Sequence, residues 1–322
     1  MDDRELLLRL ASGVQSGDAL AREAGLTRAA VWKRIQGLRA AGIGVAAAAG
    51  RGYALERPLD LLDADRIRAG LPAALRDALA GLEVAWALDS TNSELLRRPR
   101  MAGPGVEVLL AERQSAGRGR LGRAWVAPLG AQVCLSLRRG FGGGLARLGG
   151  LSLVAGVAVA EALRDLGCTG VGLKWPNDLV AGDGKLAGLL IEGGGEHAGP
   201  VQAVIGIGIN VDLPPDLAST IGQPWTDLAT LSGGVAPARD AVASAVLSRL
   251  LPALDLFDDT GLEPFLPRYA ALDVLQGRQV TVHGRELVQG QALGLAPDGG
   301  LRVATADGER VFHAGEVSVR PR

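Results

Sequence analysis

Apolar residues recur three and four positions apart through the first 42 residues, which predicts three helices. The first predicted helix carries Leu6, Leu7 and Leu10, and the second covers residues 18–24. Thr27 caps the third, on which Val31, Ile35 and Leu38 share one face. Short segments on both sides of Gly50-Arg51-Gly52 then predict a β-wing, although the alanines of residues 46–49 are poor strand formers. This order predicts a winged helix-turn-helix domain over residues 1–58.

The pattern changes at Pro58, where residues 59–82 predict a linker and a helix and residues 83–272 a large α/β domain. Its predicted strands cover residues 83–88, 106–111, 133–137, 171–175, 178–180, 186–192 and 201–211. Its predicted helices cover residues 91–98, where Thr91 and Glu94 match a capping box, 151–166, 238–257 and 262–272. Asp183-Gly184 predicts a hairpin turn that places Lys185 at the start of a strand.

From residue 273 to 322, short alternating segments separated by glycine and Asp-Gly pairs predict a small SH3-like β-barrel. The expected fold is therefore α+β and multidomain, with a mixed-sheet α/β domain at its centre. The two cysteines, Cys134 and Cys168, lie in apolar stretches and are expected to be buried thiols. With no signal peptide and no long apolar run, we expect a cytoplasmic protein without a membrane contact.

Charge restricts the partners that the chain can bind. The formal net charge is −1, so contact with nucleic acid requires a local basic patch. Residues 27–57 supply one, with six basic residues and one acid. Of the 34 basic residues, only three are lysines: Lys33, Lys174 and Lys185. In a chain that otherwise uses arginine, a lysine indicates a position where a compact ammonium is needed.

The segment Gly117-Arg118-Gly119-Arg120-Leu121-Gly122-Arg123-Ala124-Trp125 combines glycines, guanidinium groups and an indole. Glycines let the backbone approach a ligand, arginines bind carboxylate and phosphate, and an indole offers a flat face to a ring. The segment indicates a pocket for an anionic and aromatic ligand, most simply a nucleotide. Taken alone, it is also compatible with a solvated turn.

The segment Lys174-Trp175-Pro176-Asn177-Asp178, followed by Lys185, is too polar to be an ordinary core strand. A carboxylate that attacks a phosphate ester must approach a like charge, and an ammonium between the two groups reduces that repulsion. A lysine at a hairpin edge is the structural alternative for Lys185.

Two weaker motifs complete the set. Gly206-Ile207-Gly208-Ile209-Asn210 predicts close approach of another backbone or a ligand to a buried strand, with Asn210 able to pair with a base edge. Tight packing within the sheet is the structural alternative. Asp89-Ser90-Thr91-Asn92 is typical of a helix cap, and can also bind a polar uncharged ligand group.

In this order, the four motifs and the preceding helix-turn-helix resemble the bacterial bifunctional biotin–protein ligases that are also biotin-operon repressors. The resemblance covers nearly the whole chain. It implies that biotin and ATP, with Mg²⁺ carried by the ATP, form biotinyl-5′-AMP. Biotin then passes to a lysine of the biotin carboxyl carrier protein of acetyl-CoA carboxylase.

The resemblance also implies roles for individual residues. Biotin binding falls to Ser90, Thr91, Asn92, Gln114, Gly117, Arg118, Gly119, Arg120, Lys185 and Gly188. The ATP and adenylate residues are Arg118, Arg120, Arg123, Trp125, Asn177, Asp178, Lys185 and Asn210. The expected catalytic residues are Lys185, Arg118 and Arg120. Asn177 and Asp178 are left open among roles toward the phosphate, the metal and the incoming amine.

Binding of the adenylate is expected to drive homodimerisation and binding to operator DNA. The candidate DNA contacts are Thr27, Arg28, Trp32, Lys33, Gln36 and Arg51. Three other interpretations stay open: a lipoate or octanoate ligase of the same catalytic fold, a non-enzymatic sensor that binds DNA and ligand, and a ligase whose N-terminal domain no longer binds DNA.

Overall fold

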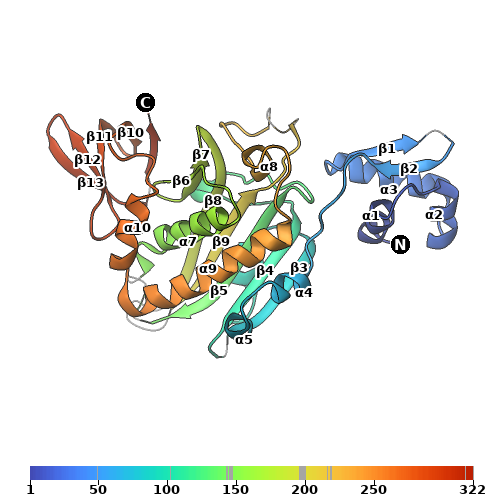
Figure 1. The fold of residues 1–322 in the computed structure, drawn as a ribbon, viewed down its shortest axis with the longest axis horizontal. Helices are drawn as coiled ribbons and strands as arrows, with labels where there is room; N and C mark the ends of the chain where they lie inside the picture. Colours follow the sequence, from blue (N-terminus) through green and yellow to red (C-terminus); the bar gives the residue numbers. More distant parts are fainter. Residues whose placement is uncertain are drawn as a thin grey trace.

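A computed structural model describes residues 1–48, 50–101, 103–142, 144, 148–195, 201–215, 217, 220–315 and 317–321. An N-terminal helical part is set apart from a central sheet and joined to it by an extended segment, and a small C-terminal sheet lies at the far side (Figure 1). No helix in these ranges combines the length and apolar character needed to cross a lipid bilayer.

The N-terminal part has the predicted order of elements. It consists of α1 (Asp3–Ala11), α2 (Gly17–Ala24), α3 (Arg28–Ala40) and an antiparallel wing of β1 (Val45–Ala48) and β2 (Gly52–Leu55). The oxygen of Thr27 caps α3 by accepting from the Ala30 amide, as predicted. The apolar faces predicted for the first and third helices are buried, while residue 49 of the predicted wing lies outside the described residues.

One central-domain residue belongs to the N-terminal core. Leu129, which follows the Gly/Arg loop, is buried among Ile43, Val45 and their neighbours. Trp86 of the central sheet packs against the same cluster. The Arg57–Asp212 ion pair at 3.2 Å is a second link across this boundary. The two parts therefore share a hydrophobic contact directly after the loop predicted to bind the ligand.

The central sheet has seven strands in the order β3-β4-β5-β9-β8-β7-β6. Only β3 and β4 run parallel, so the sheet is mixed, as predicted. The strands are β3 (Leu79–Leu88), β4 (Val106–Gln114), β5 (Gln132–Phe141), β6 (Val171–Lys174), β7 (Asp178–Ala181), β8 (Gly184–Gly195) and β9 (Val201–Asn210). β3 begins four residues before its predicted start, directly after the short helices α4 (Ala64–Ala69) and α5 (Ala73–Asp77).

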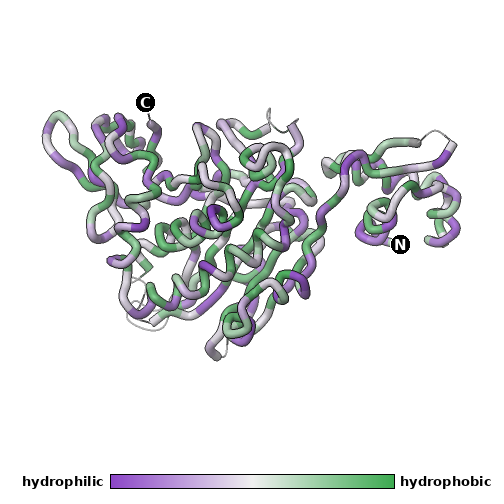
Figure 2. Tube along the Cα trace, viewed as in Figure 1, coloured by the Kyte–Doolittle hydropathy of each residue, from purple (hydrophilic) through white to green (hydrophobic). Residues whose placement is uncertain are grey.

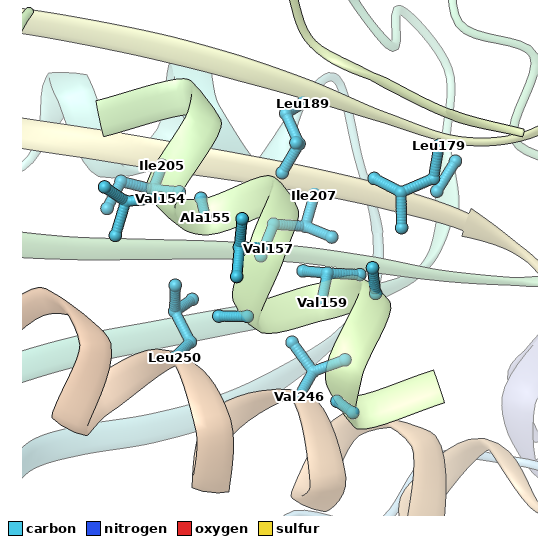
Figure 3. Close-up of a cluster of buried hydrophobic side chains, with 14 of the residues drawn as sticks. Val154, Ala155, Val157, Val159, Leu179, Leu189, Ile205, Ile207, Val246 and Leu250 are labelled. Carbon is cyan, nitrogen blue, oxygen red and sulfur yellow. The ribbon is translucent and has the colours of Figure 1, made fainter. Parts of the chain in front are cut away.

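Helices cover both faces of this sheet. α7 (Leu151–Asp165) lies between the sheet and α9 (Arg239–Thr260), and its valines meet Ile205 and Ile207 of β9 on one side and Val246 and Leu250 of α9 on the other (Figure 3). Hydrophobic residues gather along this layer (Figure 2). The short helix α6 (Thr91–Arg97) packs on the opposite face through Leu95. The burial of α7 and α9 supplies the main core.

Two local predictions were wrong, and a third element is a shorter helix than predicted. Ser90 rather than Thr91 caps α6, because the Ser90 hydroxyl accepts from the Ser93 amide while Thr91 bonds elsewhere. The hairpin between β7 and β8 turns at Gly182-Asp183, where Gly182 has a φ of 55°, one residue before the predicted pair. The predicted helix over residues 262–272 is a 3₁₀ turn, η4 (Glu263–Phe265), followed by a short α10 (Leu266–Ala270).

The C-terminal part is a five-stranded antiparallel sheet in the order β13-β12-β11-β10-β14. Its strands are β10 (Gln279–His283), β11 (Leu287–Leu295), β12 (Leu301–Thr305), β13 (Gly308–Phe312) and β14 (Ser318–Pro321). Among the described residues no ladder joins β13 to β14, so the sheet is open and the predicted barrel is not confirmed.

Candidate active site

A cavity of about 960 Å³ opens on the face of the sheet opposite α7 and α9. This volume lies within the range of small-molecule sites. Every residue proposed from the sequence for biotin or nucleotide lines it, except Gly117. The lining includes Ser90, Thr91, Asn92, Gln114, Arg118, Gly119, Arg120, Arg123, Trp125, Asn177, Asp178, Lys185, Gly188 and Asn210.

Strand alternation separates the core from the cavity. On β9, Ile205 and Ile207 face α7, so the intervening positions 206, 208 and 210 face the cavity. On β5, the cavity-side positions Gln132 and Cys134 pair with Asn210 and Gly208 of β9. One pair of strands thereby supplies an apolar face to the helices and a polar face to a ligand.

A β-bulge turns Lys185 toward the cavity. On β7, Leu179 pairs with Ala187, but the next residue, Val180, pairs with Lys185, so Leu186 is the extra residue. Leu186 and Ala187 are consequently both buried in the core, while Lys185 lines the cavity. Bulges re-aim side chains in this way, and simple alternation would have placed Lys185 on the other face.

Lys185 and its surroundings form a positively charged corner. Its Nζ lies 2.6 Å from Asp178 Oδ1, and both side chains are mostly buried. Burial lowers the pKa of the neighbouring Lys174; Asp178 raises it, and Lys185, Arg320 and Arg123 lower it further. Several cations thus surround one carboxylate, which suits a phosphate-bearing ligand.

The Gly/Arg loop closes back on itself. Trp125 donates its amide to Gly117 O at 2.8 Å, and Gly119 donates to Arg123 O at 2.7 Å. A Cβ on Gly117 would lie 2.4 Å from Trp125 O, so the glycine is required for this closure. Gly117 therefore shapes the loop and does not itself line the cavity.

The two central arginines of the loop have protein partners. Arg118 Nη2 lies 2.7 Å from a Glu192 carboxylate oxygen. Arg120 donates to Asn177 Oδ1 at 3.2 Å and to Gly315 O at 3.0 Å, and also contacts Ala314 O. Arg120 therefore joins the loop to both the β6–β7 corner and the C-terminal sheet.

A polar cluster joins the start of α6 to the sheet. The amide and hydroxyl of Thr91 both donate to Gln114 Oε1, at 2.7 and 3.1 Å. Ser136 Oγ lies 2.6 Å from both Thr91 Oγ1 and Asn92 Oδ1. Asn92 Nδ2 donates to Glu192 at 2.9 Å. Since Thr91 occupies the Gln114 oxygen, the Nε2 donor is the part of this amide that remains for a ligand.

Side chains make the close approach predicted for the glycines of β9. A Cβ on Gly206 would lie 2.3 Å from Asn92 Oδ1, and one on Gly208 would lie 2.6 Å from the Trp125 ring. Both glycines also line the cavity, so close approach of a ligand to this strand stays a prediction. The indole rests over Gly208 and Gly188, and Lys185 Nζ lies 5.6 Å from its centroid.

Sequence reasoning missed three residues of this region: Gln132, Ser136 and Glu192. Gln132 bonds both Trp125 and Asn210, Ser136 bonds the α6 residues, and Glu192 pairs with Arg118. The alternation of polar Gln132, Cys134 and Ser136 in an otherwise apolar strand was the available signal. Cys134 is buried, as predicted, and burial raises the pKa of its thiol to about 12.

The proposed DNA contacts lie on an accessible surface. Arg28, Trp32 and Lys33 of α3 are exposed, Gln36 is half-buried, and Arg51 is exposed at the wing. Residues 28, 32 and 36 follow one ridge of the helix. The Trp32 side chain is 54% exposed although apolar, and the Thr27 hydroxyl serves as the cap.

Three protein-family models match separate stretches of the chain. The HTH domain model matches residues 4–54, the Biotin/lipoate A/B protein ligase family model matches residues 87–210, and the Biotin protein ligase C terminal domain model matches residues 276–320. These three matches follow the N-terminal, central and C-terminal parts of the fold.

Relatives and solved structures agree with this assignment. The Bifunctional ligase/repressor BirA of Salmonella typhimurium is 38% identical over 98% of this chain and 96% of its own length. The Biotin–[acetyl-CoA-carboxylase] ligase of Mycobacterium tuberculosis is 40% identical over 59% of this chain and 73% of its own. A solved biotin protein ligase from Aquifex aeolicus in complex with biotin and ATP aligns with a TM-score of 0.64 and 28% identity, over 76% of this chain and 100% of the other. From its cavity, its domains and these similarities, the chain belongs to the biotin–protein ligase family, with the domain composition of the bifunctional ligase/repressors.

Proposed function

We propose that this protein activates biotin with ATP, transfers it to a lysine of the biotin carboxyl carrier protein of acetyl-CoA carboxylase, and represses biotin-synthesis genes. A biotin carboxylate oxygen bonds to the α-phosphorus as pyrophosphate leaves. The acceptor amine then attacks the acyl carbon, loses a proton, and AMP leaves. The observation that carries the proposal is the gathering of the four motifs around one cavity with Lys185 turned into it by the bulge.

The cavity divides into a polar uncharged end and a charged end. We assign the biotin ring to the end formed by Ser90, Thr91, Asn92 and Gln114, where hydroxyl and amide groups match a ureido ring. The carboxylate and α-phosphate then lie toward Lys185. The loop that carries Arg118, Arg120 and Arg123 would cover the adenylate and keep water from the mixed anhydride. Arg118 bonds Glu192 through Nη2, and its other N–H groups would be the donors to a ligand oxygen.

Magnesium needs a separate assignment. Among the described residues, no three side chains of His, Cys, Asp or Glu come together as metal ligands. We propose that Mg²⁺ enters on the ATP phosphates, neutralises their charge, and meets the protein at the acidic side chains that line the cavity, Asp178 and Asp183.

The test of the enzyme is pyrophosphate release from Mg-ATP. We expect release with biotin, little with lipoate, and none without an acid. A retained biotinyl-adenylate should then appear in the native mass. Binding of biotin without release would contradict the proposal and leave a ligand sensor, and lipoate-dependent release would indicate the lipoate-type alternative.

Gly208→Ala is expected to damage the nucleotide subsite because its Cβ would lie 2.6 Å from the Trp125 ring. Displacement of the ring should raise the KM for ATP by about tenfold or more. Steady-state kinetics at saturating biotin measure this. Gly140→Ala on β5 is the matched control, because a Cβ there meets nothing within 4 Å. An unchanged KM in Gly208→Ala would remove Trp125 from the proposed site.

The repressor half rests on α3 and the wing. We propose that the adenylate favours a homodimer that binds paired operator half-sites, since a ligand shifts this equilibrium only by binding the dimer-competent state more tightly. Operator affinity should therefore rise when biotin and ATP are added together. Equal affinity with and without them, at protein concentrations that span dimerisation, would refute the coupling.

Lys33→Gln is expected to weaken operator binding and reduce the slope of log K against log salt by about one unit, because one phosphate contact is lost. Fluorescence anisotropy at several salt concentrations measures both effects. Arg4→Gln, at an exposed position on α1, is the control. An unchanged slope for Lys33→Gln would favour a ligase whose N-terminal domain no longer contacts DNA through this helix.

A further inference from the structure

Three side chains form a directional hydrogen-bond relay along the cavity. Trp125 Nε1 donates to Gln132 Oε1 at 3.0 Å, and Gln132 Nε2 donates to Asn210 Oδ1 at 2.7 Å. Asn210 Nδ2 donates in turn to two backbone carbonyls, Lys185 O at 3.2 Å and Thr226 O at 2.9 Å. All three side chains line the cavity.

The ends of the relay fix the orientation of both amides. An indole nitrogen only donates and a backbone carbonyl only accepts. Gln132 must therefore turn its oxygen to Trp125 and its nitrogen to Asn210, and Asn210 must turn its nitrogen to the two carbonyls. Gln132 and Asn210 are 3% and 4% exposed, so a flipped amide would bury opposed dipoles with little access to water.

This orientation determines what Asn210 can offer to a ligand. Both Nδ2 protons are directed at carbonyls, and Oδ1 accepts one bond from Gln132. Its remaining capacity is therefore one acceptor lone pair. Adenine carries a donor, the exocyclic amine, at C6, whereas guanine carries a carbonyl oxygen there.

We propose that Gln132 is a specificity-determining positioning residue. The two carbonyls turn Asn210 so that its oxygen is the group left for a ligand, and the bond from Gln132 fixes where that oxygen lies, so that Asn210 selects adenine over guanine. This inference deepens the proposed function and rests on it. Gln132 does so without touching the reacting atoms, and its second bond fixes the Trp125 ring.

The test combines Gln132→Met, which has a similar length and no amide, with three nucleotides: ATP, GTP and purine riboside triphosphate, which lacks the amine. For the unaltered protein we expect kcat/KM in biotin-dependent pyrophosphate release to favour ATP over the purine analogue by about tenfold or more. In Gln132→Met this preference should shrink to within about threefold, because the Asn210 oxygen loses the bond that fixes its position. Preference over GTP should fall in parallel.

Two further variants keep the test decisive. Trp125→Phe retains a ring but removes the N–H that holds the Gln132 side chain, so it should also reduce the preference for ATP over the purine analogue. Gln202→Met, at the opposite end of β9, should leave it unchanged. Biotin affinity by calorimetry checks that each variant is folded. Full ATP preference in folded Gln132→Met and Trp125→Phe would overturn the inference, whereas absence of ATP-dependent release in the unaltered protein would instead overturn the proposed function.

Discussion

Replacing Lys185 with glutamine is expected to lower kcat for biotin-dependent pyrophosphate release by about 10²- to 10³-fold, with a smaller change in biotin affinity. The ammonium lies in a mostly buried corner, 2.6 Å from Asp178. In such a site a positive charge strongly stabilises charge that develops between a carboxylate and a phosphate. Single-turnover measurement of adenylate formation separates this step from product release.

The variant also leaves Asp178 without its ion-pair partner, so a second variant is needed to interpret the loss. Asp178→Asn combined with Lys185→Gln should be at least as slow as Lys185→Gln alone if the ammonium acts on the ligand. Recovery of the rate in the double variant would mean that the stranded carboxylate caused the defect. Arg302→Gln on the exposed C-terminal sheet should leave the rate unchanged.

Arg239→Met is expected to lower the free energy of unfolding by about 3–5 kcal/mol, the usual cost of breaking a buried ion pair. Arg239 and Glu112 are 1% and 2% exposed, and their side chains meet at 2.6 Å. Arg239 also donates to Gln132 O and Asp60 O, so its loss leaves several buried acceptors without a donor. Urea unfolding measures the change.

The control for this prediction lies on the same helix. Arg249 forms an ion pair with Asp165 at 2.7 Å, but both side chains are 50% exposed. Arg249→Met should therefore cost about 0–1 kcal/mol. Equal losses for the two arginines would show that burial of the Arg239–Glu112 pair does not matter to stability.

Much of the cavity could be predicted because its motifs combine unusual residue types at short spacing. Residues of the Gly/Arg loop and of the Lys174–Asp178 segment line one cavity, as their chemistry suggested. Helices were predicted well where apolar spacing was regular, as in α3 and α7. In these cases local sequence and tertiary packing favour the same conformation.

The features that could not be predicted depend on partners distant in sequence. The bulge at Leu186 depends on the pairing of β8 with β7, so the direction of Lys185 could not follow from alternation alone. Gln132 and Ser136 belong to an alternation of polar and apolar residues that any half-buried strand can show. Their roles follow only from hydrogen bonds to Thr91, Trp125 and Asn210. Ser90 caps α6, whereas Thr91 bonds Gln114 of β4, a partner 23 residues away in sequence.

The burial of Leu129 limits how ligase activity and DNA binding can be separated in evolution. It follows Trp125 by four residues, a length of chain that reaches about 14 Å when extended. Its side chain is buried in the N-terminal core. A descendant of this protein that lost residues 1–58 would expose Leu129 and Trp86 to water. Such a descendant is expected to need polar residues at these two positions. Loss of the N-terminal part therefore has to be accompanied by substitutions in the remaining ligase.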